Sequence, residues 1–99
     1  MERKETPNVL EEKAKKSAAV LQTANAKVMN IQLRKGEAIP EHHADAEVVI
    51  VVRKGRVQFT SEGETVEATP ENVLHMAPME NHQLLAAEDS DLLVFQIKA

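Results

Sequence analysis

The sequence predicts an all-β protein, built as a small antiparallel β-barrel or β-sandwich. Short runs of strand-forming residues follow one another along the chain, with turn residues between them. Apolar and polar residues alternate through residues 27–34, and residues 48–52 are five consecutive β-branched residues. Regularly spaced short strands joined by hairpin turns are typical of sandwiches and barrels. Closure of a barrel would also hide the edges that such strands otherwise expose.

Eight strands are expected, each bounded by turn residues. In chain order they cover residues 18–23, 27–34, 48–52, 56–60, 65–68, 73–76, 82–86 and 92–97. The strand at 48–52 is apolar at every position, so one of its faces is expected to meet the core and the other a second subunit. We therefore expect a homodimer.

Residues 1–17 are expected to form an N-terminal arm, followed by the barrel over residues 18–99. Asn8 followed by Glu11 is similar to a helix capping box, and Glu11 faces Lys15 at a spacing of four. These features predict a short helix over residues 9–17. The arm either docks on a partner or caps the end of the barrel.

Length, charge and composition narrow the function classes. The chain has 99 residues, a common size for one domain. Its net charge of −4 comes from 16 acidic and 12 basic residues, which argues against nucleic-acid binding. It has no cysteine, which excludes disulfides, thiolate nucleophiles and sulfur-ligated metals. No stretch approaches the ~20 apolar residues that span a bilayer and the N-terminus has no apolar signal segment, so we expect no membrane partner and a cytoplasmic location.

Residues 36–55 resemble the first sequence motif of the cupin family. That motif is a glycine, five residues, His-x-His, three or four residues, Glu, six residues and a second glycine. Gly36, His42 and Gly55 stand in register with it. Ala44 stands at the second histidine position and Val48 at the glutamate position.

A second stretch resembles the family's other motif, which is Pro-Gly-Asp, an apolar strand, a turn and a histidine. Pro70 opens a Pro-Glu-Asn sequence at the expected place, and His82 follows it by twelve residues. The resemblance extends over about residues 8–97, and it implies a small cupin barrel with a jelly-roll arrangement of strands. It says little about activity, because one fold supports many chemistries.

The resemblance implies a candidate metal site inside the barrel. Metal-binding cupins place three histidines and one glutamate there, and His42 and His82 retain two of these positions. His75 is a candidate third ligand, with His43 and Glu47 as further candidates. A one-residue shift turns a side chain to the opposite face of a strand, so His43 and Glu47 would replace the missing ligands only across a β-bulge. The implied cofactor is Fe, Mn, Ni or Zn, or none.

The same residues also allow a ligand pocket without metal. Its expected lining is His42, His82, Ala44, Val48 and Met76. An imidazole that titrates near neutrality can act there as a hydrogen-bond partner or a general base. Oxygenase or isomerase activity, metal-free binding of a small polar molecule, and a filled barrel that serves only for dimerisation remain open alternatives.

The alternative for His75 is a position on the outer face of the sheet. It shares a strand face with Val73 and Ala77, and a single polar residue in a strand often lies on the solvated side.

Overall fold

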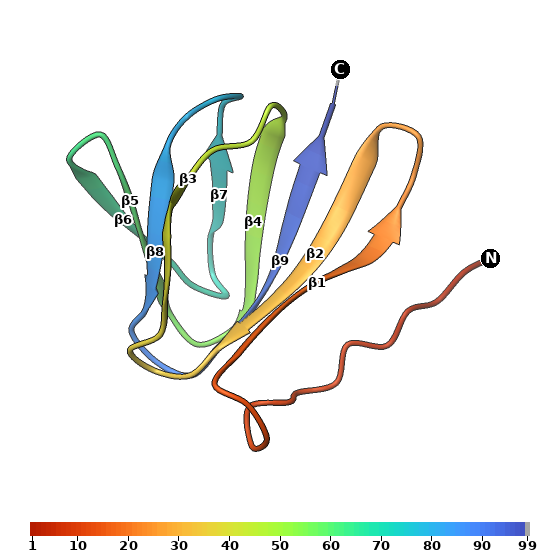
Figure 1. The fold of residues 1–99 in the computed structure, drawn as a ribbon, viewed down its shortest axis with the longest axis horizontal. Helices are drawn as coiled ribbons and strands as arrows, with labels where there is room; N and C mark the ends of the chain where they lie inside the picture. The colour runs from red at the N-terminus through yellow and green to blue at the C-terminus, as the bar shows by residue number, and fades with distance from the viewer. Residues whose placement is uncertain (99) are drawn as a thin grey trace.

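The computed structural model describes residues 1–98, which form two antiparallel β-sheets (Figure 1). The strands of the five-stranded sheet are, in spatial order, β1 (Lys15–Gln22), β2 (Ala26–Leu33), β9 (Ser90–Ile97), β4 (Glu47–Lys54) and β7 (Val73–Met76). Those of the four-stranded sheet are β3 (Ala38–His42), β8 (His82–Ala86), β5 (Val57–Ser61) and β6 (Glu64–Ala68). The predicted all-β class is therefore confirmed. Among the described residues no helix has the length and apolar character needed to cross a membrane.

The predicted N-terminal helix is wrong. Asn8 does begin a turn, since the amide of Leu10 donates to its Oδ1 at 2.9 Å and the amide of Lys13 donates to the carbonyl of Val9 at 3.1 Å. The chain then becomes extended and enters β1 at Lys15. Pairing of β1 with β2 aligns seven residue pairs in an antiparallel ladder, whereas an isolated helix as short as the predicted one is marginal in water.

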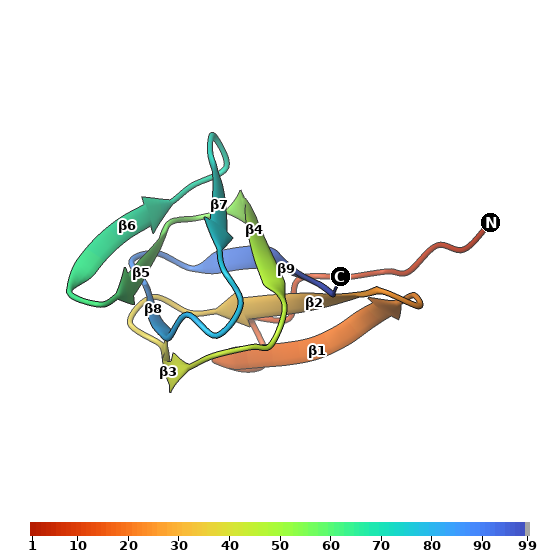
Figure 2. The ribbon, with the colours of Figure 1, turned by 90° about the horizontal axis from the view of Figure 1, so that it is seen from above.

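The two sheets enclose one hydrophobic core. Figure 2 shows β3, β8, β5 and β6 along one side of the barrel and β4, β9 and β2 along the other. Residues at alternate positions of each strand point inward, and Leu33, Ile50, Val57 and Leu92 are at most 1% exposed. Full burial of such side chains stabilises the fold by about 1.5–3 kcal/mol each.

The residues of β4 alternate between the core and the outer face of the five-stranded sheet. Val48, Ile50 and Val52 are buried inside, whereas Val49 and Val51 lie outside and are partly exposed. Cross-strand partners share a face, so Phe95, opposite Val49, also lies outside. The rows continue onto neighbouring strands, and the set defined here as the outer apolar face is Val28, Val49, Val51, Val73, Leu93 and Phe95.

The N-terminal arm covers the other end of this outer surface through a buried polar network. Asn30 and Gln32 are completely buried on β2. Gln32 donates to the carbonyl of Pro7 at 2.9 Å and accepts from the amide of Val9 at 2.9 Å. Asn30 donates to Oδ1 of Asp91 at 2.9 Å. The network binds the arm to β2 and β9 and leaves no buried side-chain polar atom of the described residues without a partner.

Candidate functional site

His42 and His82 lie side by side at one end of the barrel. They are the last residue of β3 and the first of β8, and their Cα atoms are paired across the two strands. Their rings are edge to face, with centroids 4.3 Å apart and an interplanar angle of 62°. The loops that follow β3 and precede β8 are joined by a 2.8 Å hydrogen bond from the amide of Met79 to the carbonyl of Ala44. This end of the barrel is called the mouth below.

Both histidines are fixed in the same tautomer. Nδ1 of His42 lies 3.1 Å from the carbonyl oxygen of Pro40, and Nδ1 of His82 lies 3.2 Å from that of Glu80. A carbonyl oxygen can only accept, so each Nδ1 carries a proton and donates it. In the neutral imidazole the other nitrogen, Nε2, is then a hydrogen-bond acceptor. In the neutral state the two rings therefore each keep one acceptor nitrogen, on neighbouring strands.

Burial favours the neutral form of His82. The side chain is 5% exposed and its ring centroid lies 6.4 Å from that of Phe59, a core residue of β5. Burial lowers the pKa of His82 below its ordinary value of 6.5, and the positive charge of a protonated His42 would lower it further. The carbonyl of Glu80 opposes this shift but does not overcome it. His42 is exposed, so the pair has one buried and one accessible imidazole.

The apolar residues expected in the pocket lie at the same end of the barrel. Val48 and Met76 are paired across β4 and β7 and are each 3% exposed. Ala44 lies in the loop between β3 and β4 and packs against the core. The positions at which the cupin motif implies a histidine and a glutamate thus hold apolar side chains, which pack in or against the core at this end of the barrel.

The candidate third metal ligands do not join the histidine pair. His75 and Glu47 hydrogen-bond to each other, and both are exposed on the outer side of the five-stranded sheet. His43 is exposed, with its Nδ1 3.2 Å from Oδ1 of Asn81. Over residues 1–98 there is no group of three or more His, Asp or Glu side chains placed to hold a metal ion. The donor set is therefore two imidazoles, which falls short of the three-histidine, one-glutamate set of metal-binding cupins.

A β-bulge does occur in β3, but it does not rescue His43. The irregular pairing lies between Ile39 and His42, before the histidine pair. The bulge therefore comes before the step that would be needed to turn His43 inward, and His42 remains the residue opposite His82.

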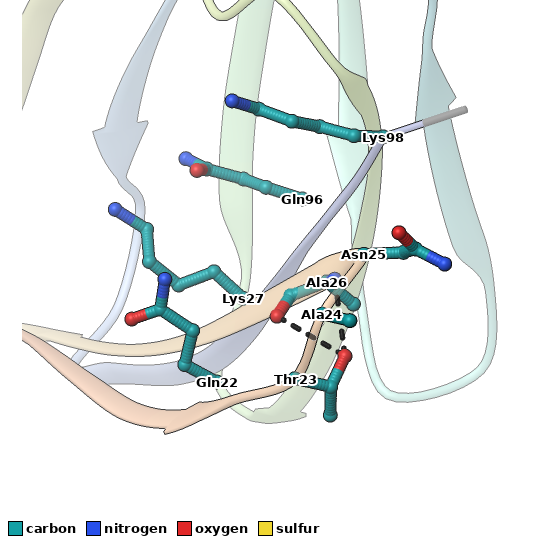
Figure 3. A pocket seen from close by; sticks show the side chains of 8 residues that line it. All are labelled: Gln22, Thr23, Ala24, Asn25, Ala26, Lys27, Gln96 and Lys98. Atoms are coloured by element: carbon teal, nitrogen blue, oxygen red, sulfur yellow. Dashed lines mark hydrogen bonds between the residues drawn. The ribbon is translucent and has the colours of Figure 1, made fainter.

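Sequence analysis did not predict a polar hollow on the five-stranded sheet, which faces the sheet that carries the two histidines. This hollow, of about 200 Å³, is lined by residues 22–27 together with Gln96 and Lys98 (Figure 3). The sequence feature that could have indicated the hollow is the presence of lysine or glutamine at the ends of strands whose interiors are apolar. Such residues are common at strand ends, so the pattern did not distinguish them from solvated positions.

Comparison with known proteins identifies the family. The family described as the AraC-like ligand binding domain matches residues 33–98, about two-thirds of the chain. A search of curated proteins found no match.

Solved structures of cupins share the fold. A cupin superfamily protein from Desulfitobacterium hafniense has a TM-score of 0.81 at 17% identity, covering 89% of this chain and 81% of its own. An RmlC-like cupin from Methanocaldococcus jannaschii has a TM-score of 0.79 at 20% identity, covering 99% and 91%. An RmlC-like cupin from Desulfovibrio desulfuricans has a TM-score of 0.77 at 23% identity, covering 94% and 95%. The chain is thus a small cupin and belongs to the AraC-like ligand binding domain family.

Proposed function

We propose that this protein binds a small polar molecule in the barrel mouth, with Nε2 of His42 and Nε2 of His82 accepting hydrogen bonds from it. The observation that carries the proposal is the matched tautomer of the two rings, each set by a backbone carbonyl. Two neighbouring acceptors suit a molecule with two hydroxyl or amine donors. Val48 and Met76 are core residues at the same end of the barrel, and polar groups beside apolar side chains are typical of small-molecule sites.

The first test is a binding titration monitored by NMR, in which neutral sugars, polyols and hydroxy acids are the probes. His42→Ala is expected to weaken binding about tenfold, because it removes one acceptor. His82→Gln tests the buried partner, and His43→Ala is the control because His43 is exposed outside the pair. Binding that His42→Ala and His82→Gln leave unchanged would contradict the proposal.

The pH dependence of the same titration tests the role of His82. Because burial lowers the pKa of His82, Nε2 is free to accept above pH 6.5. Protonation at lower pH converts Nε2 into a donor, so binding should weaken as the pH falls from 6.5 through the lowered pKa. An affinity that rises as the pH falls through this range would argue against an acceptor role.

The second candidate is a divalent transition metal, Fe, Mn, Ni or Zn, held by the same two Nε2 atoms. It is favoured by one observation: histidines that bind metals usually donate their other ring nitrogen to a carbonyl or carboxylate, as His42 and His82 do. Two imidazoles alone hold a metal weakly. Elemental analysis of untagged protein and the effect of a chelator distinguish the candidates, since binding of a polar molecule directly to the imidazoles is indifferent to chelator.

We also propose that a second copy of the chain covers the outer apolar face. The centre of this face carries no charge, and it is bordered by the Glu47–His75 pair and by Arg53. An apolar centre with a polar rim is the usual anatomy of a protein interface, and two copies can meet there without opposing like charges. The arm does not take this place, because its contacts lie at the row of Gln32 and Asp91.

Val73→Asp is expected to convert the dimer to a monomer, halving the mass measured by light scattering at micromolar concentration. Val73 is 66% exposed at the edge of the outer apolar face, so the new carboxylate is solvated in the monomer but buried in the dimer. Leu85→Asp is the control, because Leu85 is also exposed, at 42%, but lies on β8 of the other sheet. A wild-type protein that is monomeric under these conditions contradicts the dimer.

A further inference from the structure

We propose that the hollow on the facing sheet binds the carboxylate of a hydroxylated organic acid whose hydroxyl groups reach the His42–His82 pair. This inference rests on the proposed function and specifies its ligand class. The hollow contributes Lys27, Gln96 and Lys98 as donors to an anion. The histidines contribute the acceptors for the neutral part of the same molecule.

Strand register places the hollow on the inner side of the five-stranded sheet. Gln22 is paired with Lys27, Lys27 with Gln96, and Gln96 with Val48, which is in turn paired with Met76. Residues paired across antiparallel strands share a face. Val48 and Met76 are buried in the core, so the whole row belongs to the inner face.

The row also lies at the same end of the barrel as the histidines. Met76 ends β7, and the loop that follows leads directly to His82 at the start of β8. Val48 is the second residue of β4, just after the loop that follows His42. The lysines and the histidines therefore occupy facing sheets at the mouth.

The polar side chains of the hollow project to one side of the sheet. Figure 3 shows the amines of Lys27 and Lys98 and the amides of Gln22 and Gln96 projecting to the same side, whereas Asn25 points the other way. Lys27 is half-buried. Among residues 1–98, neither Lys27 nor Lys98 has a carboxylate within ion-pairing distance.

This cationic group stands out against the rest of the molecule. Lys27 and Lys98 both line this hollow, in a chain whose net charge is −4. A partly buried amine without a counter-ion favours an anion from solution, and hydrogen bonds between charged partners are about twice as strong as neutral ones. A carboxylate held by two amines and an amide fits these donors.

The matched probes are D-gluconate and D-glucitol, which differ in having a carboxylate or a hydroxymethyl group at one end. We expect wild-type protein to bind gluconate more tightly than glucitol. Lys27→Gln should weaken gluconate binding about tenfold or more, the usual effect of losing one charged hydrogen bond, and leave glucitol binding unchanged. Lys54→Gln is the control, because it removes the same charge from an exposed position at the other end of β4.

The outcomes separate this inference from the proposed function. If His42→Ala weakens binding of both probes and Lys27→Gln weakens neither, the carboxylate site is wrong and the histidine site stands. If Lys27→Gln weakens gluconate binding and His42→Ala does not, the carboxylate site stands and the proposed function fails. Gluconate binding no tighter than glucitol binding overturns the inference. Inorganic phosphate binding more tightly than acetate in a parallel titration overturns the assignment to a carboxylate.

Discussion

Gly55→Ala is expected to lower the free energy of unfolding by about 3 kcal/mol or more, a cost that combines backbone strain with a steric clash. Gly55 has φ of +89°, a conformation that residues with a side chain rarely adopt. A Cβ there would lie 2.4 Å from the carbonyl oxygen of Asp89, 2.4 Å from Oγ of Ser90 and 2.9 Å from its Cα. Ser90 is 1% exposed and hydrogen-bonds to two carbonyls, so it has little room to move.

Gly36→Ala is the matched control for this prediction. Gly36 has the same φ of +89°, but a Cβ there would meet nothing within 4 Å. It should therefore cost only the backbone strain, about 1–2 kcal/mol. Urea unfolding of the two variants measures the difference directly. Equal losses would mean that the contact between the β4–β5 corner and the β8–β9 corner does not constrain the fold.

Asp91→Ala is expected to cost about 2–4 kcal/mol, somewhat less than the breaking of a fully buried ion pair. Asp91 is 7% exposed and accepts from Nη2 of Arg53 at 2.8 and 2.9 Å and from Nδ2 of Asn30 at 2.9 Å. Removal of the carboxylate leaves the guanidinium without its partner. The side chain of Arg53 is 36% exposed, so water compensates part of the loss.

Two variants control the Asp91 prediction. Asp91→Asn keeps an acceptor for Asn30 and should lose less stability than Asp91→Ala. Glu67→Ala removes an exposed partner of Arg56, and such pairs contribute about 0–1 kcal/mol. Hydrogen exchange at the amide of Val9 should also become faster in Asp91→Ala, because that amide is bound to the same network through Gln32. Unchanged stability together with unchanged exchange would contradict the role assigned to the network.

The strands were predicted more reliably than other features, because the alternation of apolar and polar residues depends on local residue order. The alternation through 27–34 and the apolar run at 48–52 predict β2 and β4, and both strands lie where they were expected. Strand β3 was missed because Pro40 interrupts it. It is an edge strand of the four-stranded sheet, and an edge position tolerates a proline that a central strand would not.

The buried polar network could not be predicted from local sequence patterns, because the residues that it joins are far apart in the sequence. Asn30 and Gln32 alternate with the core residues Met29, Ile31 and Leu33, which is also the pattern of a strand with a solvated face. Only the fold shows that the arm covers them. The same capture of the arm explains the failed helix, since Gln32 and Arg34 bind the carbonyls of Pro7 and Leu10.

The histidine site was partly within reach of the sequence. The resemblance to the cupin motifs implied that His42 and His82 belong to one site, and the strands do pair them. Alternation also placed His75 on the same face as Val73, which lies outside. The orientation of the two imidazoles could not be predicted, because it depends on backbone carbonyls of Pro40 and Glu80 and on the register of β3 with β8.

The buried network also determines where the domain can be joined to another protein in a fusion. A fusion protein that begins at the first strand would lack Thr6, Pro7 and Val9, which bind Arg53 and Gln32. The side chains of Asn30 and Gln32 would then lose the cover of the arm and become exposed to solvent. A fusion that keeps the network must therefore include Thr6 and the residues after it, with the linker placed before Thr6.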